Sequence, residues 1–274
     1  MAKFLMKQKW HLAAMLAMAA QTALAGLGYT VTTTVERADE TEKFSEKVLT
    51  QGKQARIDFL DADGSYLVTN DGGKTFVLAN RSEAYCSSWT TTGFFQAAGN
   101  FLKKAEGLAN AELHDLSVKK VLEEPGGVIE GFDTTHIRVV SKYGAKARIL
   151  FLTMEYAIEE VDDLWMTSDL ELPFFEQLWL ESNANTGFTY MDELSEQRLA
   201  FETGPVLKME NVVTLRNVKK NESEVKKETT VVSNLREITA GDVPPGHFDL
   251  PRCEPVSRKM MEKEATRMLK KHVR

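Results

Sequence analysis

The stretch QARIDFLDADGSYLVTNDGGKTFVL, residues 54–78, decides the fold. It contains three short runs rich in apolar and β-branched residues, at 54–60, 65–69 and 74–78. The groups Asp61-Ala62-Asp63-Gly64 and Asn70-Asp71-Gly72-Gly73 separate these runs, and such residues form tight turns. Turns this short join neighbouring strands that run in opposite directions. The stretch therefore predicts an antiparallel β-meander.

Further strand patterns lie on both sides of the meander. They are found at residues 29–35, 134–143, 146–156, 163–167, 206–218 and 229–238. The dipeptide Gly144-Ala145 has the length of a hairpin turn, and the charged segment 219–227 joins the last two strands. Residues 38–46 are polar and predict a link. Most of the chain is thus predicted to form antiparallel sheet.

Two segments have the period of an α-helix. From Phe94 to Leu113, apolar residues recur every three or four positions and line one helix face. Leu172-Pro173 opens a second helical segment through residue 180, since proline is tolerated in a first turn. Strands interrupted by two helices predict an α+β fold with the helices against one side of a curved sheet. Without an internal repeat or linker, one domain over residues 26–253 is expected.

The composition excludes several classes of protein. The chain has 274 residues, 43% of them hydrophobic, with 34 Lys and Arg against 40 Asp and Glu. These values are typical of a globular domain and exclude a disordered chain. A net charge of -6 also argues against nucleic-acid binding, because that requires a surplus of cations to neutralise phosphates.

The N-terminus has the pattern of a secretory signal peptide over residues 1–25. Lys3, Lys7 and Lys9 precede the apolar run 12–20, and Ala23-Leu24-Ala25 forms a small-x-small cleavage site. A membrane anchor or a buried helix is the alternative, but the run is shorter than the ~20 residues that span a bilayer. Cleavage after residue 25 predicts an exported, periplasmic protein. The residue directly after the cleavage site is not a cysteine, so the mature protein is not predicted to be a lipoprotein. Loss of three lysines with the leader lowers the net charge from -6 to -9.

The two cysteines are Cys86 and Cys253. In an oxidising compartment two thiols tend to be bridged. No C-x-x-C spacing or neighbouring histidine indicates a redox or metal site. A structural disulfide between the early sheet and the C-terminal segment is therefore predicted, with two free thiols as the alternative.

Several motifs occur along the chain in an order that resembles a known family. They are the stretch 53–89, which contains Arg56-Ile57-Asp58-Phe59 and Asp71-Gly72-Gly73-Lys74, and the segments 129–136, 164–167, 204–208 and 243–251. This order resembles a bacterial exported family of unknown function whose members look like LolA/LolB-type lipoprotein-localisation factors. The resemblance implies an unclosed, LolA-like antiparallel β half-barrel with helices over an apolar concave face. It also implies periplasmic residence and binding of an acyl chain or lipoprotein. A long helix from Phe94 and the tail from Glu254 depart from the family.

No catalytic residue, metal site or cofactor is predicted. The loop that begins at Asp61 lacks the Gly and Glu that an EF-hand requires. His114, His136, His247 and His272 are scattered and are interpreted as ordinary polar or partly buried residues. His114 and Asp115 are expected to diverge on a helix. The carboxylate pairs 123–124, 159–160 and 162–163 are interpreted as solvated surface, because adjacent residues of a strand face opposite sides.

Aromatic residues gather in the helical segments and close to them, where an apolar ligand would be buried. This predicted apolar lining comprises Phe94, Phe95, Phe101, Trp165, Phe174, Phe175 and Trp179. An acyl chain would gain about 0.8 kcal/mol for each methylene buried against such side chains. The alternative is that these residues only fill the core.

The tail, residues 254–274, is predicted to be a basic amphipathic helix. Its apolar residues, Met261 and Leu269 among them, cluster on one face, and seven Lys and Arg residues surround them from position 258 onward. Such a helix binds an anionic membrane surface or an acidic partner, or it docks on its own acidic domain. The sequence thus predicts an exported protein that binds a hydrophobic small molecule, lipid or acyl chain without catalysis. The alternative is a structural protein of the envelope that makes contacts through its tail.

Overall fold

The computed structural model describes eleven parts of the chain. They are residues 26–37, 40–62, 64–81, 85–109, 112–149, 152–170, 178, 181–182, 184–218, 225–241 and 243–255. The predicted signal peptide, the predicted helix 172–180 except Leu178, and the tail from residue 256 lie outside these residues. Those three expectations stay predictions.

The described strands form one twelve-stranded, unclosed sheet in the order β12-β6-β5-β4-β3-β2-β1-β11-β10-β9-β8-β7. All neighbours are antiparallel except β12, which runs parallel to β6. The strands are β1 (Gly26–Arg37), β2 (Glu40–Gln51), β3 (Gln54–Phe59), β4 (Ser65–Thr69), β5 (Thr75–Asn80), β6 (Tyr85–Thr90), β7 (Glu112–Ile129), β8 (Phe132–Ile149), β9 (Leu152–Met166), β10 (Val206–Asn217), β11 (Val225–Gly241) and β12 (Glu254–Pro255). The meander predicted from residues 54–78 is thus present as β3, β4 and β5.

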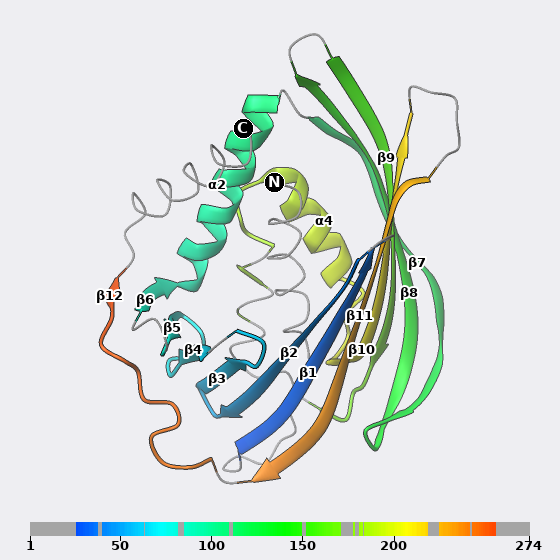
Figure 1. Ribbon diagram of the computed structural model, residues 1–274. Coiled ribbons are helices and arrows are strands. Elements are labelled where there is room, and N and C mark those ends of the chain that lie inside the picture. Colours follow the sequence, from blue (N-terminus) through cyan, green and yellow to red (C-terminus); the bar gives the residue numbers. More distant parts are fainter. Residues whose placement is uncertain are drawn as a thin grey trace.

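The sheet is strongly curved, and helices α2 (Thr91–Ala109) and α4 (Thr189–Leu199) lie on its inner, concave side (Figure 1). The predicted α+β class and the open half-barrel architecture are therefore confirmed. The curvature follows from the right-handed twist that strands accumulate across a wide sheet.

The main core lies between the concave face and the helices. Alternate residues of the strands point into it, as the two-residue period requires. Phe95 of α2 reaches the same core and is 1% exposed. The sheet residues that form this core include Leu27, Tyr29, Val31, Val48, Ile57, Leu67, Phe76, Ile137, Val139, Leu164, Met166, Leu207, Met209 and Leu235.

A second, smaller core lies on the outer face of β4 and β5. Tyr66 and Val68 of β4 and Val77 of β5 pack there against Phe248. Phe248 belongs to the C-terminal segment 243–253, which runs along the outside of the sheet (Figure 1). This segment therefore buries apolar residues that would otherwise face solvent.

Local interactions fix where the two helices begin. The Thr90 hydroxyl accepts a hydrogen bond of 3.2 Å from the Gly93 backbone N–H, an N-terminal cap of α2. In α4 the Asp192 carboxylate accepts hydrogen bonds of 2.8 Å from the backbone N–H groups of Thr186 and Gly187. The first backbone donors of a helix lack partners inside it, and the Thr90 contact satisfies one of them in α2. The Asp192 contacts instead hold the loop that precedes α4 against the first turn of that helix.

Two helical predictions need correction. The predicted helix from Phe94 to Leu113 ends at Ala109, and His114 and Asp115 lie in β7. Their side chains do not diverge, because His114 Nδ1 lies 2.7 Å from Asp115 Oδ2 and Asp115 has a positive φ of 56°. Helix α4 was not predicted, because its sequence is polar on nearly all sides and buries only Leu194.

Two strand predictions also need correction. The predicted polar link 38–46 belongs largely to β2, where Glu46 is buried on the concave face. The Gly144-Ala145 pair is not a turn, because β8 continues through it to Ile149. A Cβ atom at Gly144 would lie 2.1 Å from the His114 ring. Glycine is therefore present to admit that ring rather than to reverse the chain.

Candidate functional site

Four aromatic side chains form a continuous aromatic surface where α2 meets the concave sheet. Phe94 contacts Phe76 of β5, Trp89 of β6 and Phe95, with ring centroids 5.5–5.6 Å apart in edge-to-face geometry. Phe95 is buried, whereas Phe94 and Trp89 are only partly buried. We refer to Phe76, Trp89, Phe94 and Phe95 as the aromatic surface. It presents apolar area at the margin of the main core.

The other residues of the predicted apolar lining are not brought to this surface by the described structure. Trp165 lies on the outer face of β9, because its neighbours Leu164 and Met166 point into the main core. The side chain of Phe101 lies outside the described residues, as do Phe174, Phe175 and Trp179. Trp165 therefore does not line the concave face. Its closeness in sequence to other aromatic residues predicted a position in the lining, whereas the alternation of the strand decides which face it occupies.

A cluster of polar side chains lies on the concave face beneath α4. Arg198 of α4 donates to Glu160 Oε2 at 2.7 Å and makes a second, short contact with the Asp162 carboxylate. Asn211 of β10 donates to Asp162 Oδ1 at 2.5 Å, and the Tyr143 hydroxyl of β8 donates to Glu160 Oε1 at 2.6 Å. We refer to this group as the polar cluster. It comprises Ser141, Tyr143, Glu160, Asp162, Arg198, Glu202 and Asn211.

The polar cluster corrects the interpretation of the carboxylate pair 162–163 as solvated surface. The two residues do face opposite sides of β9, but Asp162 is 2% exposed and Asp163 is 9% exposed. Each is neutralised by a cation from a distant segment, Arg198 for Asp162 and Arg138 for Asp163. Such partners could not be read from the local sequence, because 36 residues separate Asp162 from Arg198.

Burial changes the proton affinity of this cluster. It raises the pKa of Asp162, although the charge of Arg198 opposes that effect. It also raises the pKa of the Tyr143 hydroxyl, and the nearby Glu160 carboxylate adds to the rise. For Arg198 burial acts to lower the pKa, but the charges of Asp162 and Glu160 outweigh it and raise the pKa. The guanidinium is therefore firmly held in its charged form.

Glu202 is the member of the cluster that titrates near neutral pH. Burial raises its pKa from 4.5 to about 7, and the charge of Arg198 only partly opposes this. Between pH 4.5 and about pH 7, Glu202 therefore keeps its proton in the folded protein, whereas the same carboxyl group has lost it in the unfolded chain. By linkage, this group makes the protein less stable as the pH rises through that window.

Glu202→Gln is therefore expected to stabilise the protein more at pH 8 than at pH 5. The difference in the free energy of unfolding relative to the wild type should grow by up to about 2 kcal/mol between these pH values. Urea denaturation of both proteins at each pH measures it. An equal change at pH 5 and pH 8 would contradict a raised pKa at Glu202.

His136 forms a second polar arrangement on the outer face of β8, β9 and β10. Its ring stacks on Trp165 at 4.4 Å, and Lys208 Nζ lies 4.2 Å from the Trp165 centroid. His136 Nε2 lies 2.7 Å from Asp163 Oδ1, and Nδ1 lies 3.1 Å from Glu124 Oε1. Both ring nitrogens thus have carboxylate partners. This agrees with the prediction of a partly buried histidine.

Asp163 anchors this outer arrangement. Burial acts to raise its pKa, but hydrogen bonds from Arg138 and His136 outweigh burial and lower the pKa. Arg138 Nε and Nη2 donate to the two Asp163 oxygens at 2.8 and 3.0 Å. The carboxylate is thus held in its charged form by two donors on the neighbouring strand.

The described residues contain no group of three or more His, Cys, Asp or Glu arranged to hold a metal ion. Asp61 instead accepts a hydrogen bond from the Ser45 backbone N–H. Among the helices that the structure describes, none combines the length and the apolar character needed to cross a bilayer.

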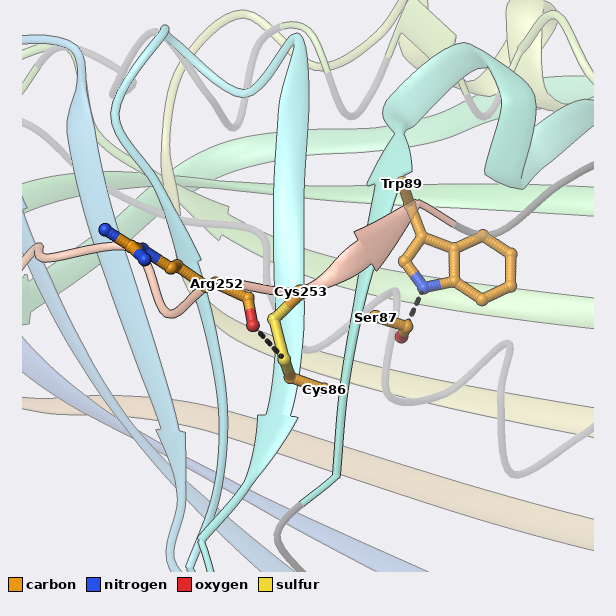
Figure 2. The surroundings of a disulfide bond; sticks show 5 residues. All are labelled: Cys86, Ser87, Trp89, Arg252 and Cys253. Carbon is orange, nitrogen blue, oxygen red and sulfur yellow. Dashed lines mark hydrogen bonds between the residues drawn. A yellow bond between two sulfur atoms is a disulfide. The ribbon is translucent and has the colours of Figure 1, made fainter.

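The predicted disulfide is confirmed. Cys86 of β6 and Cys253 are bridged, with 5.4 Å between their Cα atoms (Figure 2). The bond lies beside the short β12 strand, which pairs Glu254 with Ser87. Beside it, Trp89 Nε1 donates a hydrogen bond of 2.8 Å to Ser87 Oγ (Figure 2). Glu254 and Pro255, the first residues of the predicted tail helix, therefore form sheet.

Comparisons with known proteins add the following. No family model matches the chain, and no curated protein matches it. A LolA superfamily protein from Nitrosomonas europaea is 9% identical with a TM-score of 0.31, over 89% of this chain and 97% of that chain. A DUF1329 family protein from Desulfovibrio piger is also 9% identical, with a TM-score of 0.29, over 89% and 96% of the two chains.

A third solved structure is described as an outer membrane lipoprotein-sorting protein domain from Vibrio parahaemolyticus. It is 6% identical with a TM-score of 0.31, over 89% of this chain and 94% of that chain. The three descriptions name the group of proteins that the sequence motifs resemble. The fold class itself rests on the strand order and curvature given above, which make an unclosed antiparallel half-barrel.

Proposed function

We propose that the protein is an exported binding protein that holds a hydrophobic small molecule, a lipid or a lipoprotein acyl chain without catalysing a reaction. The aromatic surface is the observation that carries this proposal. Its ligand-facing residues are Trp89 and Phe94, because both are partly buried and pack at the edge of the main core.

The energetics of the aromatic surface favour an apolar ligand. When a further apolar group covers partly exposed aromatic side chains, the free energy of the complex falls by about 25 cal/mol per Å² of apolar area buried. An acyl chain offers such a group along its whole length. Edge-to-face contacts fix the rings of Phe76, Phe94 and Phe95 against one another, so little side-chain entropy would be lost on binding.

The compartment and the tail belong to the same proposal. The signal-peptide pattern of residues 1–25 supports export to the periplasm, and an acyl chain in transit through an aqueous compartment needs an apolar carrier. Contact of the basic segment 254–274 with a membrane surface remains the predicted alternative role, and its residues from 256 onward lie outside the described structure.

The experiment is a binding titration with decanol, which offers a ten-carbon chain and an uncharged head. The wild type is expected to bind it, and Phe94→Ala should weaken binding about tenfold, because a truncated ring removes roughly 1.5 kcal/mol of apolar contact. Displacement of a fluorescent apolar probe and native mass spectrometry both measure this.

Trp165→Ala is the matched control. It removes a similar half-buried aromatic from the outer face, so decanol affinity should stay within about twofold of the wild type. Circular dichroism establishes that both variants are folded. An equal loss of affinity in both variants, or a wild type that binds no decanol, would overturn the proposal.

A further inference from the structure

Strand β7 is a long open edge of the sheet. It is the last strand in the sheet order, and among the strands that the structure describes it pairs only with β8 (Figure 1). At the other end of the sheet the last strand, β12, has two residues, whereas β7 has 18. The backbone N–H and C=O groups of an edge strand can pair with a further strand. β7 is therefore the edge at which this sheet can be extended.

The middle of β7 carries a palindrome of charge. Residues 119–124 read Lys-Lys-Val-Leu-Glu-Glu, which places two cations, two apolar residues and two anions in order. We refer to residues 119–124 as the charge palindrome. If a second copy of β7 lies antiparallel to the first, with a two-fold axis at the centre of the palindrome, each lysine meets a glutamate of the other copy. Lys119 then lies opposite Glu124, and Lys120 lies opposite Glu123.

A β-bulge at the centre of the palindrome decides on which faces the charges lie. The register of β7 against β8 shifts between Lys120 and Leu122, so that β7 has one extra residue there. In a regular strand, residues five positions apart, such as Lys119 and Glu124, would lie on opposite faces. Two copies in one continuous sheet could then not bring these unlike charges together. Because of the bulge, they can.

The register shows that the outer pair of charges shares one face. Glu124 lies opposite His136 of β8, and the two side chains are in contact on the outer face. Lys119 lies opposite Val140, four residues further along a regular stretch of β8, and therefore on the same face. Both Lys119 and Glu124 are exposed. They are thus free to approach the same residues of a second copy.

The inner pair of charges shares the concave face. Lys120 lies opposite Val139 and Glu123 opposite Ile137, and both of these β8 residues belong to the main core. The charged groups of Lys120 and Glu123 contact each other within one chain, although about half of the glutamate side chain, 55%, is exposed. A second copy would add another such pair at the same place. Four charges of alternating sign would then lie together.

The centre of the charge palindrome is apolar. Val121 is 56% exposed, which is unusual for so large an apolar side chain, and Leu122 is half-buried. An apolar centre surrounded by polar residues is the usual composition of a protein interface. Lysines and bulges on an edge strand oppose pairing with an arbitrary strand. The order of charges in β7 instead favours one partner, a second copy of the same strand, in one register.

We propose that two copies of the protein associate through β7 and form one continuous sheet across a two-fold axis between Val121 and Leu122. The proposal does not depend on the ligand-binding role of the protein. Pro125 has no N–H to donate, so pairing extends little beyond the charge palindrome. An interface of this size is small, and a reversible dimer with a dissociation constant of about 10–100 µM is expected.

Sedimentation equilibrium of the protein as isolated from cells measures this association. Raising the salt concentration from about 0.1 M to about 1 M shortens the Debye length from about 10 Å to about 3 Å, so the dimer should weaken about tenfold. Hydrogen exchange should show protection that rises with protein concentration at residues 118–124. A protein that stays monomeric well above the expected dissociation constant, or one protected at another surface, would overturn the proposal.

A charge exchange tests the register. Lys119→Glu places two glutamates opposite each other at both ends of the palindrome, and Glu124→Lys does the same with two lysines. Each variant alone should self-associate about tenfold more weakly than the wild type. In an equimolar mixture of the two variants, unlike charges meet again at both positions of a mixed dimer. Association should therefore return to within about threefold of the wild type.

Lys74→Glu is the matched control. It makes the same change of charge at an exposed residue just before β5, away from β7 in the sheet order, so self-association should stay within about twofold of the wild type. Circular dichroism and urea denaturation establish that all variants are folded, which matters most for Glu124→Lys because Glu124 contacts His136. An equal loss in Lys74→Glu, or a mixture that does not restore association, would refute pairing through the charge palindrome.

Discussion

Replacement of both Cys86 and Cys253 by serine is expected to lower the free energy of unfolding by about 4–5 kcal/mol. The two cysteines are 167 residues apart in sequence, and a bridge across so long a segment removes much conformational entropy from the unfolded chain. The disulfide also holds the segment 243–253 against the outer face of the sheet, where Phe248 covers the small outer core. Urea denaturation of the oxidised wild type and the double variant measures the loss.

The matched control for this prediction is Arg252→Ala. Arg252 is exposed and adjoins Cys253 without taking part in the bridge, so its loss should cost less than about 0.5 kcal/mol. Hydrogen exchange should show loss of protection in β4 and β5 only in the double variant, because their outer face becomes accessible to water. An unchanged denaturation midpoint in the double variant would show that the bridge does not stabilise the fold.

Replacement of Arg198 by alanine is the second large effect, and we expect a loss of about 3–4 kcal/mol in the free energy of unfolding. Asp162 is 2% exposed and Glu160 has 12% of its side chain exposed, so both would stay buried without the cation that neutralises them. An uncompensated buried carboxylate either remains charged at a high cost or takes up a proton. The loss should therefore be larger at pH 8 than at pH 5. Urea denaturation at both pH values measures it.

Lys142→Ala is the control for Arg198→Ala. The Lys142–Glu159 pair joins the same two strands one residue away from Glu160, but 62% of the lysine side chain is exposed. Exposed ion pairs contribute about 0–1 kcal/mol because water screens them. If the two variants lost stability equally, the buried setting of Asp162 and Glu160 would have no energetic role, contrary to the structure.

Strands with strong alternation and clear turns could be predicted from the sequence, whereas others could not. The meander 54–78 contains its own turn residues, so each strand boundary is set by neighbours in the chain. β7 and β2 lack such signals, because β7 contains Pro125 and Gly126-Gly127 and much of β2 is charged. Their strand conformation depends on pairing with β8 and β1, and pairing partners are not visible in a local pattern.

The candidate site was predictable only in part for the same reason. The helical period of the segment from Phe94 indicated an apolar face that contains Phe94, and Phe95 of the predicted lining lies buried in the main core. Trp165 was misplaced, because an alternating pattern identifies two faces of a strand without stating which one the helices cover. The polar cluster was missed, since Arg198 lies in a helix without a clear apolar stripe and reaches Asp162 only in the folded chain.

The sequence by itself predicted an antiparallel sheet with helices on one side, and it favoured a bridge between Cys86 and Cys253 over two free thiols. Both follow from local chemistry: residue alternation, turn residues and a count of two thiols. Only the tertiary structure decided which faces are buried and which charges meet. The curvature of the sheet brings α4 over β9, so that a polar helix neutralises buried acids on the concave face (Figure 1). Contacts between segments so far apart depend on packing, and packing has no signature in neighbouring residues.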